Sequence, residues 1–135
     1  MLIFHFLGLV MSLGSMVAFL VMRRSCSKVS STESDYLLQN VRRFLRMSHI
    51  GLGIMLITGG YLMTPYWSAL AEMPLLHIKF TIFALWYGTL IALSIYTKKA
   101  AKSQIKLCNP RIGFLSIVSI LFGILAVVLA VSQFQ

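Results

Sequence analysis

The chain is poor in acidic residues, cysteine and proline. Among 135 residues there are three aspartates and glutamates against twelve lysines and arginines, with two cysteines and three prolines. So few carboxylates leave no paired general acid and base, and no Ser/His/Asp set or phosphate-binding glycine loop is present. Cys26 and Cys108 are too few for a disulfide framework, and no zinc spacing occurs. We expect both to be free thiols.

The charge that is present does not indicate a nucleic-acid-binding protein. Hydrophobic residues make up 59% of the chain and charged residues 11%, and the mean hydropathy is +0.87. Soluble domains average about 45–50% apolar and about 25% charged residues. The net charge of +9 comes from basic residues between long apolar runs, where they act as topology signals. The chain is therefore predicted to lie in a lipid bilayer.

Four uncharged runs predict a single all-α transmembrane domain, an up-and-down four-helix bundle. Each run approaches the roughly 20 residues that cross a bilayer core. Helical spacing of apolar residues before the second run predicts that its helix begins early, near Ser34 or Asp35. Either Ser30–Glu33 or Thr32–Asp35 could supply its N-terminal cap. The predicted spans are residues 1–22, 42–63, 74–97 and 111–134, with cytoplasmic loops 23–41 and 98–110.

The distribution of basic residues predicts the orientation. Six lysines and arginines lie in residues 23–46, five lie in 98–111, and none lies in 64–73. Cytoplasmic segments carry such an excess, so both termini are expected on the extracytoplasmic side. Tyr61, Tyr66 and Trp67 would form the outer aromatic belt.

Ionisable groups within the spans are the candidates for chemistry, because such groups are costly in lipid. At about 1.5 Å per residue, His5 and His77 both lie roughly 5 Å below the outer boundary, and His49 lies about 20 Å further in. Two histidines from separate helices at one depth suit axial ligation of haem b. Met63 is an alternative axial ligand, and Lys79 could pair with the propionates.

Each candidate also has a simpler interpretation. His5 and His77 could be interfacial polar residues, His49 a structural one, Met63 a packing residue, and Lys79 could extend its amine to the surface. His77 and Lys79 are about 200° apart around a helix, so only one of them can face a shared ligand.

Small residues predict where helices pack closely. Gly8, Ser12 and Ser15 follow His5 along one stripe of the first span. The second span is rich in glycine at Gly51, Gly53, Gly59 and Gly60. The fourth span has few polar residues beyond Ser116 and Ser119, which indicates a scaffold or lipid-facing wall.

Three segments resemble one family of small membrane proteins. These are Leu76–Phe80 with the basic end Tyr96–Lys99, Arg42–Met47 before the glycine-rich span, and Phe4–Phe6. They resemble the HemJ type of protoporphyrinogen oxidase and, more loosely, the CopD-like membrane domain and a related group of uncharacterised four-helix proteins.

The resemblance implies haem b binding in the bacterial inner membrane and oxidation of a tetrapyrrole substrate. It maps the functional histidine of the family onto His5 and its functional lysine onto Lys79, which favours Lys79 over His77 as the inward-facing residue. A different hypothesis, from the glycine-rich span, is a non-catalytic subunit packed against other subunits of a respiratory or photosynthetic complex. A transporter is disfavoured, because no carboxylate or helix break lies within a span.

Overall fold

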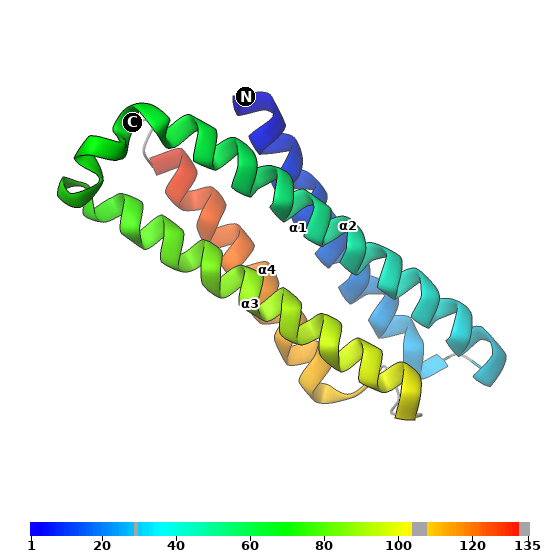
Figure 1. Ribbon diagram of the computed structural model, residues 1–135. Coiled ribbons are helices and arrows are strands. Elements are labelled where there is room, and N and C mark those ends of the chain that lie inside the picture. Colours follow the sequence, from blue (N-terminus) through cyan, green and yellow to red (C-terminus); the bar gives the residue numbers. More distant parts are fainter. Residues whose placement is uncertain (29, 104–107, 133–135) are drawn as a thin grey trace.

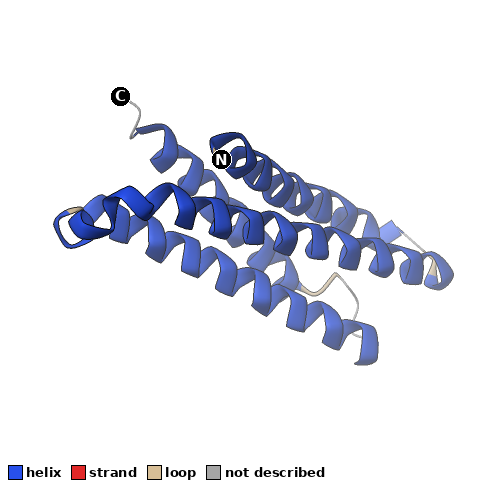
Figure 2. Cartoon of the chain, turned by 45° about the horizontal axis from the view of Figure 1, so that its top comes forward, coloured by secondary structure: helices blue, strands red, loops and turns tan. Residues whose placement is uncertain are grey.

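The computed structural model describes residues 1–28, 30–103 and 108–132, and in these ranges the chain is helical apart from short connections (Figure 2). Four of the helices in this part are long and apolar enough to cross a membrane. The prediction of an all-α protein with four membrane-spanning helices is confirmed. The elements are α1 (Leu2–Ser25), η1 (Cys26–Lys28), α2 (Ser31–Met63), η2 (Thr64–Glu72), α3 (Pro74–Ser103) and α4 (Pro110–Ser132).

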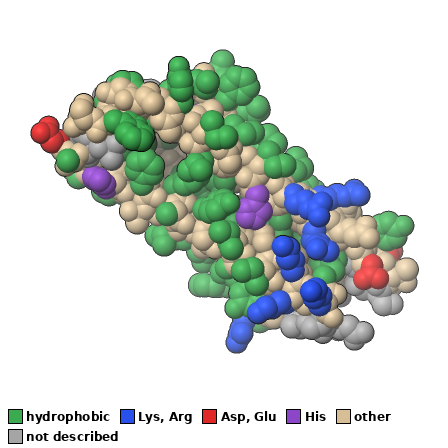
Figure 3. All heavy atoms as spheres, in the orientation of Figure 1, with side chains coloured by type: hydrophobic (Ala, Val, Ile, Leu, Met, Phe, Trp, Pro, Cys, Tyr) green, Lys and Arg blue, Asp and Glu red, His purple; other side chains and the backbone are tan. Residues whose placement is uncertain are grey.

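The helices pack as two antiparallel pairs (Figure 1). α1 lies against α2 and α3 against α4, α1 also contacts α4, and the contacts between α2 and α3 are sparse. Both termini lie at one end of the bundle, while lysines and arginines gather at the other end of the face seen in Figure 3. Which end faces the cytoplasm stays a prediction from the basic residues.

The second helix begins earlier than we expected. α2 starts at Ser31, where the backbone N–H of Ser30 donates to Glu33 Oε2 at 3.3 Å, so the first of the two expected caps is used. With 33 residues the helix is about 50 Å long, well beyond the roughly 30 Å bilayer core. Most of the predicted loop 23–41 is helical, since α1 ends at Ser25 and α2 begins at Ser31.

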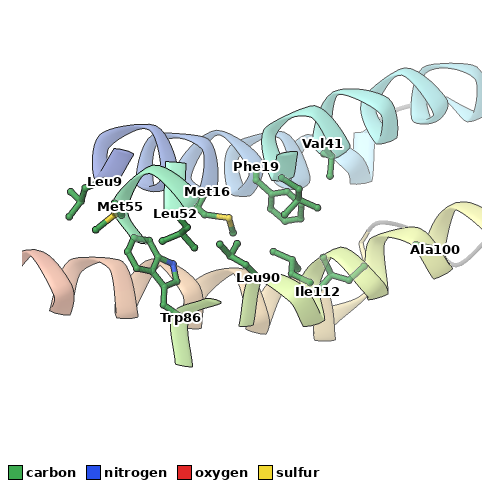
Figure 4. Close-up of a cluster of buried hydrophobic side chains, with 12 residues drawn as sticks. Leu9, Met16, Phe19, Val41, Leu52, Met55, Trp86, Leu90, Ala100 and Ile112 are labelled. Atoms are coloured by element: carbon green, nitrogen blue, oxygen red, sulfur yellow. The ribbon is translucent and has the colours of Figure 1, made fainter. Parts of the chain in front are cut away.

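A buried cluster runs along the centre of the bundle (Figure 4). Trp86 of α3 is fully buried and its Nε1–H donates to Ser119 Oγ of α4 at 3.0 Å. Ser116 is also fully buried and donates to carbonyls of its own helix. The two serines of α4 thus face the bundle, so one side of this helix is a packing surface and not a lipid-facing wall.

α1 and α2 approach each other at two of the predicted small residues. A Cβ atom added to Gly8 would lie 2.6 Å from the Gly51 carbonyl oxygen, and one added to Gly51 would lie 2.6 Å from the Gly8 carbonyl oxygen. One turn away, the hydroxyls of Ser12 and Ser48 are hydrogen-bonded at 3.0 Å and both side chains are fully buried. The pair is joined backbone to backbone, as small residues allow in membrane helices.

The basic end of the bundle is tied together by Arg23. Its Nη2 donates to the carbonyl oxygens of Cys108 at 3.4 Å and Asn109 at 3.0 Å, just before α4 begins. Cys26 lies one turn from Arg23, and its thiol is hydrogen-bonded to that of Cys108. Burial and this hydrogen bond raise the pKa of the Cys26 thiol to about 11. The two free thiols are thus neighbours, which their separation in the sequence did not indicate.

Candidate functional site

A cavity of about 630 Å³ lies at the end of the bundle that carries the termini, and all four helices line it. The roughly 300–1,000 Å³ range of ligand sites includes this volume. The lining is mostly apolar, with Phe6, Phe80 and Phe83 among its aromatic residues. It comes from residues 2–9 of α1, 55–63 of α2, 76–83 of α3 and 126–130 of α4, with Tyr66 and Met73 from the segment between α2 and α3.

His5 places an imidazole on this cavity, and residues of α2 set the orientation of the ring. Its Nδ1 lies 3.0 Å from Thr58 Oγ1, while that hydroxyl donates to the Ile54 carbonyl at 2.7 Å. With the hydroxyl proton of Thr58 on the Ile54 carbonyl, His5 Nδ1–H is assigned as the donor to Thr58, which leaves the lone pair of a neutral ring on Nε2. Such a hydrogen bond commonly fixes the tautomer of a metal-binding histidine.

Gly59 makes room for the His5 ring. A Cβ atom added there would lie 3.4 Å from His5 Cε1, in van der Waals contact with the imidazole, so a side chain larger than alanine would have to displace the ring. The close approach at Gly8, one turn along α1 from His5, holds this part of α1 on α2. The histidine is therefore placed by two glycines and a threonine.

Lys79 and Met63 line the same cavity as His5. Lys79 comes from the first turns of α3 and is half-buried, and Met63 is the last residue of α2 and is also half-buried. Both belong to the residues that the sequence singled out. A cation and a thioether are thus placed on the same cavity as an imidazole.

His77 lies elsewhere. It is exposed on α3 and is not part of the cavity lining, although it is at a similar depth to Lys79. The two residues are about 200° apart around the helix, so the orientation that turns Lys79 to the cavity turns His77 away from it. Of the two alternatives, the structure places Lys79 on the cavity.

His49 lies near the middle of α2, further from the termini than the large cavity. Its Nε2 is hydrogen-bonded to Ser94 Oγ at 2.8 Å, and its ring meets that of Tyr87 edge to face at a centroid distance of 5.8 Å. It lines a second, smaller cavity of about 210 Å³. The prediction that His49 does not share a ligand with His5 agrees with this placement.

Within the part of the chain that the structure describes, no group of three His, Cys, Asp or Glu side chains could hold a metal ion. An imidazole beside a large apolar cavity instead suits a flat cofactor that brings most ligands of its metal with it. Comparison with protein-family models, curated proteins and solved structures finds no match to this chain.

Thr58 is the site residue that the sequence analysis did not identify. It is the hydroxyl residue within the glycine-rich run of α2, immediately before Gly59-Gly60. A hydroxyl inside an apolar span needs a hydrogen-bond partner. The hydroxyl of Thr58 in this span was therefore the sequence feature that could have indicated a contact with another helix. The partner across the helix interface could be recognised only once α1 and α2 were aligned.

Proposed function

We propose that the protein is an integral membrane protein that binds haem b in the cavity at the end with the termini. The observation that carries the proposal is His5 on this cavity, with its Nδ1 hydrogen-bonded to Thr58. In the assigned tautomer, Nε2 is the nitrogen that would bind iron. Haem proteins bind iron with the imidazole of an axial histidine, and helix bundles hold such cofactors between facing helices.

The remaining lining fits the same group. A porphyrin is a large apolar ring, and the cavity offers apolar and aromatic walls from all four helices. Its propionates are anions, and the ammonium of Lys79 lies on this cavity near the end of the bundle. In this proposal Lys79 would pair with a propionate and Met63 would be a second residue that binds the iron. His77 contributes to neither role, because it lies outside the cavity.

We further propose an oxidoreductase function, in line with the resemblance to the HemJ type of protoporphyrinogen oxidase. Bound haem would pass electrons from the substrate one at a time to a membrane electron acceptor, and this chain's residues would hold and orient the reactants. His5 holds the iron, Lys79 orients a carboxylate of haem or of a tetrapyrrole substrate, and the apolar walls keep water from the ring. The bacterial inner membrane, with the termini outside the cytoplasm, is part of the same proposal.

The test is the visible spectrum of the chain purified alone in detergent and supplied with haemin. We expect a Soret band that His5→Ala removes, together with a lower haem stoichiometry by pyridine haemochrome assay. His77→Ala and His49→Ala are matched controls, because they remove the same side chain outside the cavity. A colourless wild-type chain would refute haem binding, as would a Soret band that depends on His77 and not on His5.

Lys79 is tested separately. Lys79→Ala should weaken haem retention about fivefold to tenfold, because a hydrogen bond to a charged group contributes about 1.5–3 kcal/mol when buried and less at a half-exposed site. Lys79→Arg keeps the cation and should restore most of the affinity. Equal haem affinity in the wild type and both variants would remove Lys79 from the site.

The alternative proposal is a non-catalytic subunit of a larger complex. Gly53 has open space around it: nothing described lies within 4 Å of an added Cβ atom. Ile50 and Ile57, near it on α2, are 57% and 74% exposed. A helix of another subunit could pack on this face. Co-purification at fixed stoichiometry, lost in Gly53→Leu while no haem is bound, would favour this role.

A further inference from the structure

A second cavity, of about 210 Å³, lies between α2 and α3 near the basic end of the bundle. It is remote from the haem proposal, since none of its residues lines the larger cavity. It is open on one side, because its cations are exposed while Leu45 and Thr97 at its back are buried. Its lining is Arg42, Leu45, Arg46, His49, Ser94, Thr97 and Lys98.

Helical spacing brings the positive charges together. Arg42 and Arg46 are four residues apart, so they lie on one face of α2, and His49 continues that face. Lys98 is four residues beyond Ser94 on α3. The hydrogen bond of His49 Nε2 with Ser94 Oγ, 2.8 Å long, joins the two helices at the inner end of the cavity. Three cations from two helices therefore surround one small space.

These charges are not compensated within the described part of the chain. No acidic residue lines the cavity, and no ion pair or hydrogen bond joins the side chains of Arg42, Arg46 or Lys98 to another described residue. Gathered cations repel one another unless an anion or water screens them. A cavity built this way favours a ligand with a concentrated negative charge.

Arginine selects phosphate among such anions. Its planar guanidinium donates paired hydrogen bonds to phosphate oxygens, and lysine adds a point charge. The His49–Ser94 pair adds a neutral donor: whichever group gives its proton to the other, one N–H or O–H of the pair is left to donate. The lining thus matches a phosphate diester more closely than a carboxylate or a halide.

The surroundings indicate that the phosphate belongs to a lipid. α2 and α3 contact each other sparsely, and in the membrane topology predicted from the sequence the space between them would be open to lipid. Ile91 and Ile95 of α3 are 42% and 49% exposed and lie on the membrane side of Lys98. Acyl chains could cover these residues while the headgroup enters the cavity, whose volume is too small for a whole lipid. Basic pockets between transmembrane helices are known sites for anionic headgroups.

We propose that the cavity between α2 and α3 binds the headgroup phosphate of an anionic phospholipid. Arg42, Arg46 and Lys98 hold the phosphate oxygens, and His49 with Ser94 forms the floor. The lipid fills the space between two helices that otherwise have few contacts. The site is independent of any haem in the other cavity.

The experiment measures binding of phosphatidylglycerol and phosphatidylcholine to the full chain in detergent by native mass spectrometry. We expect phosphatidylglycerol to bind with a stoichiometry of one and at least tenfold more tightly than phosphatidylcholine. Each basic residue near a membrane surface contributes about fivefold to affinity for anionic lipid. Arg42→Ala/Arg46→Ala should therefore weaken phosphatidylglycerol binding about 25-fold, and Lys98→Ala about fivefold.

Arg43→Ala is the matched control. Arg43 is exposed beside Arg42 on the same helix and carries the same charge, but it does not line the cavity. The variant should bind phosphatidylglycerol within about twofold of the wild type. The matched single variant Arg42→Ala should weaken binding about fivefold. An equal loss from Arg43→Ala would mean general attraction to an anionic surface and would overturn the proposal.

Controls for folding and a competition experiment complete the test. Circular dichroism and size-exclusion chromatography of every variant establish that the helices and the single species are retained, and Lys98→Ala tests the site from the other helix. Inorganic phosphate is added as a competitor at millimolar concentration. Little displacement of phosphatidylglycerol supports a lipid site, whereas tight phosphate binding without lipid selectivity would identify a soluble anion and refute the lipid.

Discussion

Replacing Gly51 by alanine would place a methyl group against the backbone of α1. The added Cβ would lie 2.6 Å from the Gly8 carbonyl oxygen and 2.9 Å from the Ser12 backbone nitrogen. Backbone atoms cannot turn aside as a flexible side chain can, so the two helices must separate. Separation would also lengthen the 3.0 Å hydrogen bond between Ser12 and Ser48.

The size of the effect follows from the packing. Inserting a methyl group into a well-packed interface costs about 1–3 kcal/mol, and a hydrogen bond between membrane helices contributes about 0.6 kcal/mol. Alanine is favoured over glycine in a helix by up to about 1 kcal/mol, which offsets part of this loss. Gly53→Ala gains the same propensity in open space. The difference between the two variants therefore isolates the packing, and we expect Gly51→Ala to be less stable by about 1–3 kcal/mol.

The assay is reversible unfolding in mixed micelles of increasing dodecyl sulfate content, followed by far-ultraviolet circular dichroism. Because His5 and Thr58 lie on the same helix interface, Gly51→Ala should also weaken haem binding if the cavity holds haem. Stability of Gly51→Ala within about 0.5 kcal/mol of Gly53→Ala, the usual range for a neutral surface change, would show that the helices are not held at this contact.

Three other outcomes are expected. Thr58→Val removes the acceptor of the His5 Nδ1–H and should lower haem affinity about tenfold, as loss of a residue that orients a metal ligand commonly does. An unchanged affinity in a haemin titration would contradict the orientation of the His5 ring by Thr58. Trp86→Phe leaves the Ser119 hydroxyl buried without its donor and should cost about 1–3 kcal/mol of unfolding free energy, part of which Trp86→Phe/Ser119→Ala recovers. Burial and the hydrogen bond with Cys108 raise the pKa of the Cys26 thiol to about 11, so the rate of alkylation of Cys26 should rise with pH until the pH nears 11. A rate that stops rising near about pH 8.5, the ordinary pKa of a cysteine thiol, would refute this.

Much of the fold could be predicted from local sequence. The lengths and apolarity of the four helices depend on the chain alone, since a bilayer requires about 20 apolar residues per crossing. Two boundaries were misplaced: α2 starts at Ser31, before the apolar run, and α3 continues to Ser103, beyond the predicted end at residue 97. Hydropathy does not register such an extension, and the capping residues Ser30 and Glu33 were the better guide.

The candidate site could also be predicted only in part from the sequence. Depth along each helix follows from residue number, and so His5 and Lys79 could be assigned to one level and His49 to another. Rotation around the helix axis could not be assigned, because both faces of α3 are apolar and give little periodic signal. The choice between Lys79 and His77 depended on how α3 packs against the other helices.

What the sequence by itself determined is the number of spans, their approximate ends and the level of each polar group, because these quantities depend on hydropathy and on a constant rise per residue. Only the tertiary structure decided which groups meet: His5 with Thr58, Cys26 with Cys108, and the arginines of α2 with Lys98 of α3. The physical reason is that such contacts depend on the rotation and register of whole helices. Those are set by close packing, as at Gly8 and Gly51, and not by any property of the residues that come together.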